Sequence, residues 1–300
     1  MLSVSNLSVQ FGKRVLFDEV NVTFTQGNCY GIIGANGAGK STFLKILSGK
    51  QEPTSGRVIL EPGKRMSVLE QDHYAYDDYT VLDTVIMGNK VLSKIKKEMD
   101  DLYADYSDEH AERIGELQIQ FDEMNGWNAE SDAAALLSNL GITEDMHYTM
   151  MSEMDGKLKV RVLLAQALFG NPDVLIMDEP TNGLDIPSKA LFRKVIAGNL
   201  PADSSLIIST HQVHDVEQLL DHVFVLNNSE MIINASVEEI AKEYEFTYRN
   251  ANEMDENVLY AEPSLQGNAV IARRKADSPE TTINLELLFN AATLGKLNNK

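Results

Sequence analysis

Apolar and polar residues alternate over residues 2–28, and this alternation predicts antiparallel strands with one buried face. A short apolar run at residues 29–33 predicts a buried strand directly afterwards. The apolar positions within residues 43–47 share one helical face, which predicts a helix. Between this strand and this helix lies a glycine-rich stretch, residues 34–42. The beginning of the chain is therefore expected to run as strand, glycine-rich loop and helix.

Residues 80–150 change to a helical period. Apolar side chains recur at every third or fourth position on both sides of a polar turn at residues 105–108, and the first of these runs begins at Val91 and ends at Tyr106. This pattern predicts a long helical hairpin, which a further helix at residues 129–140 follows. Residues 72–150 hold five Lys and Arg against eighteen Asp and Glu, so the hairpin is either a solvated helical face or an acidic contact arm.

Helices and buried strands alternate after residue 156, which predicts an α/β fold. Beyond residue 244 short apolar pieces are separated by polar gaps, and these predict a small α+β appendage whose last residues, 296–300, are frayed. The elements expected before the appendage are helices at 156–169, from Pro187 onward and at 237–243, and strands at 174–177, 205–209, 223–226 and 231–234.

The glycine-rich stretch fits the phosphate-binding pattern G-x-x-x-x-G-K-[ST]. Its glycines let successive backbone N–H groups curl around phosphate oxygens, and the N-terminus of the next helix adds positive partial charge. Lys40 is expected to reach the β- and γ-phosphates of a nucleotide, and the Ser41 hydroxyl to ligate Mg²⁺. A glycine turn that holds nothing is the alternative, and the flanking strand and helix argue against it. The candidate nucleotide-binding residues of the loop are Gly34, Asn36, Gly37, Gly39, Lys40, Ser41 and Thr42.

Polar side chains follow three of the expected strands. Asp178 and Glu179 come directly after the strand at 174–177; the first is expected to hold Mg²⁺ through water, and the second to polarise a water for attack on the γ-phosphate. His211 follows the strand at 205–209 and is expected at the same sheet edge as the loop. Gln71 also follows a strand and could ligate Mg²⁺, although an ordinary surface glutamine is the simpler explanation when it is taken alone.

Composition narrows the function classes. The formal net charge of −19 disfavours a protein that binds nucleic acid directly through its phosphates. The single cysteine, Cys29, excludes a disulfide framework or a cysteine metal site within one chain. The N-terminus lacks a signal pattern, and no apolar run reaches the roughly 18–20 residues that cross a bilayer. We therefore expect a cytoplasmic protein that reaches the inner face of the membrane, if at all, through a partner.

The motifs together resemble those of the ATP-binding cassette (ABC) ATPases, and the resemblance covers about residues 1–243. It implies a P-loop, RecA-like α/β core with an antiparallel β subdomain and a helical subdomain at about residues 72–155, before the appendage at 244–300. It also implies ATP and Mg²⁺ as ligands, ATP hydrolysis, and a head-to-tail homodimer that sandwiches two ATP molecules. The motifs in the order and spacing of the family are the glycine-rich loop, Gln71, Asp178 with Glu179, residues 182–185 and His211.

The resemblance also implies roles for individual residues. The implied catalytic residues are Glu179 as base, His211 at the γ-phosphate, Lys40 and Gln71. The implied Mg²⁺ ligands are Ser41, Gln71 and Asp178. Phe11 would stack on adenine, and Asp185 would act across the dimer interface.

The segment 151–162 departs from the family's signature, Leu-Ser-Gly-Gly-Gln followed by Arg-Val, which binds the γ-phosphate held by the partner cassette. Counting back from the Arg-Val pair puts Asp155 where the serine belongs, whereas counting from the start of the segment restores Ser152 but needs three extra residues. Asp155 would then bring a like charge close to the γ-phosphate. It would also serve as N-cap of a helix that begins at Gly156, which is the favoured interpretation and does not exclude the first.

The two halves of the chain resemble different branches of the family. The first half is similar to the first cassette of the F subfamily, whose members are soluble and translation-associated, in residues 69–73, the helical hairpin and residues 161–169. From about residue 181 the chain is similar to the ATP-binding subunit of a bacterial exporter, in residues 182–189, 209–212 and 262–268. In the F subfamily a second cassette follows and the histidine segment reads Ser-His-Asp, and neither is present here. We hypothesise that the chain mixes two branches of one superfamily, by recombination or by design.

Three functions are compatible with the sequence. The first is an ATP-hydrolysing subunit that drives a membrane exporter, with a separate transmembrane permease as partner. The second is a soluble ATPase of the F type on the ribosome, which the hairpin supports and the acidic charge disfavours. The third is an ATP-binding switch with little turnover, which Asp155 alone favours. The exporter subunit is the favoured prediction.

Overall fold

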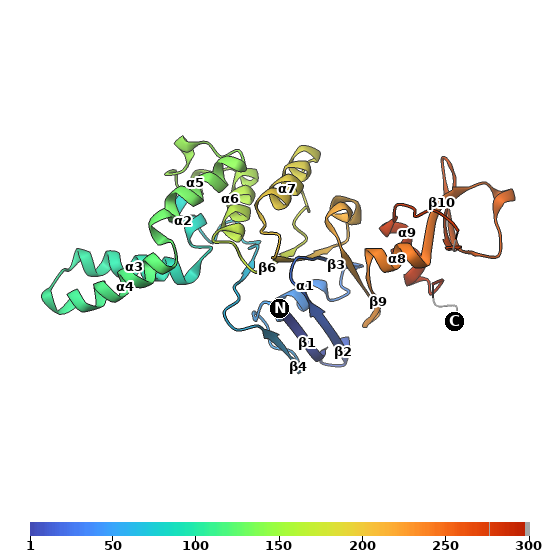
Figure 1. The fold of residues 1–300 in the computed structure, drawn as a ribbon, viewed down its shortest axis with the longest axis horizontal. Helices are drawn as coiled ribbons and strands as arrows, with labels where there is room; N and C mark the ends of the chain where they lie inside the picture. The colour runs from blue at the N-terminus through green and yellow to red at the C-terminus, as the bar shows by residue number, and fades with distance from the viewer. Residues whose placement is uncertain (276, 298–300) are drawn as a thin grey trace. The chain divides into compact units, whose positions relative to one another are not determined.

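The computed structural model describes residues 1–275 and 277–297 and divides into two compact units (Figure 1). No helix in these described ranges is long and apolar enough to cross a membrane. The predicted division into a cassette at 1–243 and an appendage stays a prediction. The first unit contains Met1–Lys64, Ile176–Gly183 and Asp203–Lys300, and the second contains Arg65–Leu175 and Leu184–Ala202.

The first unit begins with an antiparallel sheet of order β2-β1-β4. Leu2, Val4, Leu7 and Val9 of β1 are buried, and more exposed side chains lie between them. The predicted alternation of the first residues is thus confirmed. The strands are β1 (Leu2–Phe11), β2 (Arg14–Phe24) and β4 (Ser55–Leu60).

A second, mostly buried sheet of the same unit has the strand order β6-β7-β3-β8-β9. β3 is parallel to both of its neighbours, and β9 closes the order as an antiparallel strand. Helix α1 (Lys40–Leu47) leaves the loop after β3 and packs against β3 and β7. This is the expected α/β core of a P-loop protein. The strands are β3 (Cys29–Gly34), β6 (Val174–Asp178), β7 (Ser205–Thr210), β8 (His222–Asn227) and β9 (Glu230–Ser236).

The chain after residue 236 forms the helix α8 and then a small α+β group. An antiparallel sheet of order β10-β12-β11 packs against helix α9. The sequence pattern missed β10, because Glu245 and Thr247 interrupt its buried residues Tyr244 and Phe246. Of the expected frayed end, residues 298–300 lie outside the described residues. The elements are α8 (Val237–Glu243), β10 (Tyr244–Arg249), β11 (Val258–Ser264), β12 (Gly267–Arg273) and α9 (Leu285–Thr293).

The second unit is mainly helical. Its helices α3 and α4 lie side by side, as Figure 1 shows, and confirm the predicted hairpin. Its strand β5 (Met66–Val68) lies next to β6, whose first residues belong to this unit. The helices are α2 (Val81–Ile86), α3 (Lys90–Ala104), α4 (Ala111–Glu123), α5 (Ala129–Asn139), α6 (Gly156–Leu168) and α7 (Ile186–Asn199).

The predicted apolar stripe of the first hairpin helix was wrong at both ends. Val91 is 58% exposed, whereas its neighbour Leu92 is buried with Ile95 and Met99. Tyr106 lies beyond the end of α3 and is 60% exposed. The stripe that meets the rest of the unit therefore starts one residue later, about 100° around the helix from the position of Val91.

Candidate active site

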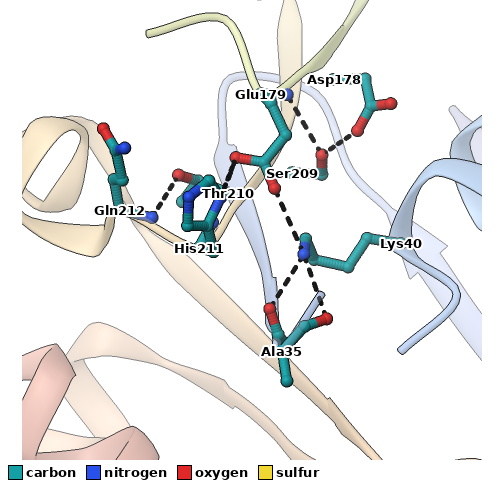
Figure 2. Close-up of polar contacts among 9 residues, drawn as sticks. Ala35, Lys40, Asp178, Glu179, Ser209, Thr210, His211 and Gln212 are labelled. Atoms are coloured by element: carbon teal, nitrogen blue, oxygen red, sulfur yellow. Dashed lines mark hydrogen bonds and ion pairs between the residues drawn. The ribbon is translucent and has the colours of Figure 1, made fainter. Parts of the chain in front are cut away.

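The carboxyl ends of the parallel strands place the predicted groups of the first unit at one sheet edge. Ile33 of β3 is paired with Thr210 of β7, so the phosphate loop and His211 leave the sheet side by side. The backbone N–H of Glu179, just after β6, donates to the Ser209 carbonyl at 3.0 Å. Three segments far apart in the sequence thus end at the same edge, as Figure 2 shows.

The phosphate loop turns into helix α1 at Gly39. Gly39 is the N-cap with φ 101°, a left-handed conformation that favours glycine. A helix leaves its first N–H groups without intrahelical partners. Because Gly39 has no side chain to accept from them, these N–H groups face the loop and are suited to phosphate oxygens.

Lys40, the first residue of α1, is held inside the loop. Its side chain is 5% exposed, and its Nζ donates to the carbonyls of Gly34 at 2.9 Å and Ala35 at 3.4 Å. The same Nζ lies 3.2 Å from Oε1 of Glu179 (Figure 2). The loop carbonyls orient the ammonium group, and Glu179 supplies the opposite charge that a buried cation needs.

Glu179 connects Lys40 to His211. Its Oε2 lies 2.7 Å from Nδ1 of His211 and accepts from the His211 backbone N–H at 3.2 Å. The backbone of Glu179 has a φ of 47°, which a non-glycine residue rarely adopts and which points to a constrained functional position. The carboxylate predicted to be the base is therefore held from two sides.

Asp178 is supported by a residue that the sequence did not single out. The Ser209 hydroxyl donates to Oδ1 of Asp178, and Ser209 is fully buried. A hydrogen-bonded carboxylate of fixed orientation is suited to hold Mg²⁺ through water. The available signal was a serine near the carboxyl end of β7, the strand next to β6, which ends at Asp178.

Lys40, Glu179 and His211 open onto a cavity of about 590 Å³ in the first unit, whereas the predicted residues Gly34 and Asp178 are not among those that line it. A buried ammonium group, two hydroxyls and a helix N-terminus in one cavity form a donor set that fits a nucleotide triphosphate with Mg²⁺. Arg14, Leu16 and Asn182 line it as well, and the sequence did not predict them. The predicted residues that line it are Phe11, Asn36, Gly37, Gly39, Lys40, Ser41, Thr42, Glu179 and His211.

The remaining metal candidate, Gln71, follows β5 in the second unit and is exposed. In the described ranges no group of three or more His, Cys, Asp or Glu is placed to hold a metal ion. Mg²⁺ commonly takes one or two protein ligands together with phosphate oxygens and water, so it does not need such a group. The roles of Ser41 and Asp178 as its ligands stay predictions. The role of Gln71 stays a prediction.

The signature segment lies in the second unit. Asp155 is the N-cap of α6, and its Oδ1 accepts from the backbone N–H of Leu158 at 2.9 Å. The predicted cap is confirmed. Ser152 is exposed in a short 3₁₀ helix, Met151–Glu153, and Gly156 is the first residue of α6. The choice between Ser152 and Asp155 as the residue that meets a γ-phosphate stays open.

Asp185, predicted to act across a dimer interface, is the N-cap of α7 in the same unit. It accepts from the backbone N–H of Ser188 at 3.0 Å and from Nζ of Lys157 at 2.9 Å. Hydrogen bonding by the Ser188 side chain, then by Lys157 and then by the Ser188 backbone N–H, holds the pKa of the Asp185 carboxyl well below its ordinary range. Lys157 lies in the first turn of α6, next to the signature segment. Its contact with Asp185 therefore joins the two segments that are predicted to meet a partner cassette.

The chain is similar to known ABC ATPases along most of its length. Residues 17–182 match the family model described as ABC transporter. The ABC transporter ATP-binding protein YkpA of Bacillus subtilis (strain 168) is 46% identical over 253 residues, which are 84% of this chain and 45% of YkpA. The energy-dependent translational throttle protein EttA of Mycobacterium tuberculosis (strain ATCC 25618 / H37Rv) is 31% identical over 222 residues, 72% of this chain and 38% of EttA. The chain thus spans less than half the length of these relatives.

A solved structure has the same fold. The dimeric post-hydrolysis structure of the ATP-binding cassette MJ0796, bound to ADP and phosphate, aligns with a TM-score of 0.58 at 19% identity and covers 79% of this chain and 99% of that one. The chain belongs to the ABC transporter family. Its cassette is an ATPase domain that uses ATP with Mg²⁺.

The hypothesis that the chain mixes two branches of one superfamily is not needed. The alignment with YkpA covers 253 of the 300 residues, so it includes residue 180, near which a change of subfamily was predicted. A single relative that is 46% identical across this point explains both halves, so two origins need not be assumed.

Proposed function

We propose that this chain is the cassette of a translation-associated ATPase of the F type, and that ATP closes it against a second cassette on the ribosome. The observation that carries the proposal is the projecting pair of helices α3 and α4 in the second unit, in a chain that is similar to EttA over 72% of its length. The sequence alone favours the exporter subunit over the F-type ATPase, and this proposal reverses that order.

The chemistry assigned to the site is attack of water on the γ-phosphate of ATP. Glu179 accepts a proton from the attacking water as general base. Lys40 moves from Glu179 to the β- and γ-phosphates, and His211 donates a hydrogen bond to the γ-phosphate. Ser41 and Asp178 would hold Mg²⁺, which supplies neutralisation of the phosphate charge when it is bound.

A second cassette completes the site in this proposal. Ser152, Asp155 and Asp185 lie at exposed turns or helix N-termini, where a partner's nucleotide can approach them. A second copy of this chain, in a head-to-tail homodimer, is one source of that cassette. The dimeric structure of the cassette MJ0796 supports such pairing.

The charge of the segment that contains the hairpin limits what it touches. Residues 72–150 carry eighteen acidic against five basic side chains, and residues 90–123, the hairpin itself, carry ten against five, so contact with bare phosphate backbone is electrostatically unfavourable. The proposed contact on the ribosome is therefore a basic protein surface, and direct nucleic-acid binding is not part of the proposal.

The test is co-sedimentation with ribosomes. Glu179→Gln should hold ATP without hydrolysing it and should pellet with ribosomes in the presence of ATP but not ADP. Glu230→Gln, an exposed change at the start of β9 and outside the cavity lining, is the matched control and should behave like the unmodified protein. Failure of Glu179→Gln to pellet with ribosomes under any nucleotide condition would overturn the ribosome proposal.

A subunit that drives a membrane exporter is the second candidate. The α+β group of β10–β12 and α9 and the name of YkpA favour it. Under this proposal a separate permease holds the cassette at the inner face of the membrane. Recovery of an integral membrane protein with Glu179→Gln, and of no ribosomes, would support the exporter in place of the first candidate.

A further inference from the structure

The turn between β1 and β2 presents two side chains to the nucleotide cavity. Phe11 and Arg14 are paired across the turn, and Gly12 between them has φ 60°. Directly paired residues in an antiparallel pair have Cβ atoms about 4.5–5.5 Å apart. The side chain of Gln10 donates to the Gly12 carbonyl at 2.7 Å and fixes the turn further. Phe11 and Arg14 both line the cavity of about 590 Å³.

The start of β2 is also held by the core sheet that contains β8 and β9. The Ser229 hydroxyl, in the turn between β8 and β9, donates to the carbonyl of Val15 at 2.6 Å. Val15 is the neighbour of Arg14, so the backbone that carries the guanidinium is anchored to the core sheet. The position of Arg14 beside the phosphate loop is thus built into the fold.

Arg14 touches the phosphate loop directly. Its Nη2 donates to the Gly37 carbonyl at 3.0 Å. A guanidinium has five N–H donors in a fixed plane, so the others remain available for an anion. Among the described residues, no carboxylate forms an ion pair with Arg14, whereas Lys40, the cation deeper in the loop, is paired with Glu179.

We propose that Arg14 binds ATP through the phosphate next to the ribose, the α-phosphate. Phe11, which is predicted to stack on adenine, Arg14 and Lys40 all line the same cavity, so the bound nucleotide would extend from Phe11 towards Lys40. Arg14 is paired with Phe11, so it lies where the α-phosphate follows the ribose of a nucleotide stacked on Phe11. Lys40, at the start of α1, binds the β- and γ-phosphates. In a chain with a net charge of −19, an arginine without an acidic partner at the cavity is also a local source of attraction for an anionic ligand.

The test compares nucleotides of decreasing phosphate number. ATP, ADP, AMP and adenosine are titrated against a fluorescent ATP analogue on Arg14→Ala, Arg14→Lys and the unmodified chain. Arg14→Ala should weaken ATP, ADP and AMP each by about tenfold and leave adenosine unchanged, because a charge-assisted hydrogen bond to the α-phosphate is common to the first three. Arg14→Lys should recover part of the loss, since it keeps the charge but not the fork. Lys13→Ala removes the same charge from the same turn outside the cavity and is the matched control with unchanged affinities.

Arg14→Gln separates ligand binding from support of the loop. Glutamine can still donate to the Gly37 carbonyl but carries no charge. Under the proposal it binds nucleotides almost as weakly as Arg14→Ala. Affinity of Arg14→Gln equal to that of the unmodified chain would assign Arg14 to support of the loop and overturn the proposal. Loss of adenosine binding to the same degree, or a loss confined to ATP, would also overturn it.

Discussion

The sheet edge of the first unit and the signature segment of the second unit hold their charged side chains in opposite ways. Lys40 is 5% exposed and is held by loop carbonyls and by Glu179, which lies 139 positions later in the chain. Asp155 and Asp185 are exposed, and each caps a helix through the backbone N–H three residues onward. The first arrangement depends on strand order, whereas the second depends mainly on local sequence.

A substitution should cost more at the buried sheet edge than at the exposed helix caps. Removal of one partner from a buried charge pair leaves the other charge uncompensated, and this is expensive. An exposed aspartate at a helix N-terminus contributes a cap worth about 1 kcal/mol, and an exposed ion pair such as Lys157 with Asp185 contributes little. Substitutions at the sheet edge should therefore have larger effects than substitutions at the exposed helix caps.

Glu179→Gln should have the largest effect. It removes the general base and the charge that faces Lys40 and His211, so kcat for ATP should fall by about 10²–10⁴-fold. ATP binding should persist, because the loop donors remain. Phosphate release at saturating ATP measures the change, and Glu230→Gln is the control. Turnover that persists unchanged in Glu179→Gln would remove Glu179 from the mechanism.

Ser209→Ala should weaken the use of Mg²⁺. The buried hydroxyl orients Asp178, and loss of such a supporting hydrogen bond commonly costs about 10–100-fold in metal affinity or activity. The Mg²⁺ concentration at half-maximal ATPase activity measures the effect. Ser205→Ala is the matched control. Ser205 is also buried, but it lies at the opposite end of β7, and its hydroxyl donates to the Thr25 carbonyl. An equal shift in both variants would contradict a specific role for Ser209.

Asp155→Ala should lower stability by about 1 kcal/mol through loss of the N-cap of α6, and thermal or urea unfolding measures this. Asp155→Ser keeps a capping oxygen and removes the charge. If Asp155 faces a γ-phosphate, Asp155→Ser should raise turnover without a loss of stability. Unchanged turnover in Asp155→Ser would leave Asp155 with its capping role.

The smallest expected effect is on pH dependence. Hydrogen bonding to Glu217, and the charges of Glu286 on α9 and of Asp215, raise the pKa of His214. Because the pKa of His214 is higher in the folded state, its protonated form stabilises the folded protein. This stabilisation is fully present below the unfolded pKa of about 6.5 and is lost as the pH rises through the folded pKa. Since the His214 side chain is 66% exposed, the effect should be about 0.5 kcal/mol or less.

Glu217→Gln tests this sign. It should lower the melting temperature slightly at pH 5.5 and leave it unchanged at pH 9, with Glu230→Gln as the control at both values. A larger loss at pH 9 than at pH 5.5 would contradict the assignment to His214.

Elements with a strong local pattern were predictable. The phosphate loop, the buried strands with their terminal carboxylates and the acidic hairpin all follow from spacing, because each has a period or a backbone requirement of its own. The stripe at Val91 and the strand β10 were not predictable, because the side that a helix buries and the pairing of a polar strand depend on neighbours.

The phosphate loop, the two carboxylates after a buried strand and an aspartate able to cap α6 can all be read from the residues alone. Glycine conformations, strand ends and helix caps are local requirements of the backbone. The support of Asp178 by Ser209, the place of Glu179 between Lys40 and His211, and the presence of Arg14 at the nucleotide cavity follow only from the fold. Such contacts join residues far apart in the chain, and strand order and register set them, which no local pattern encodes.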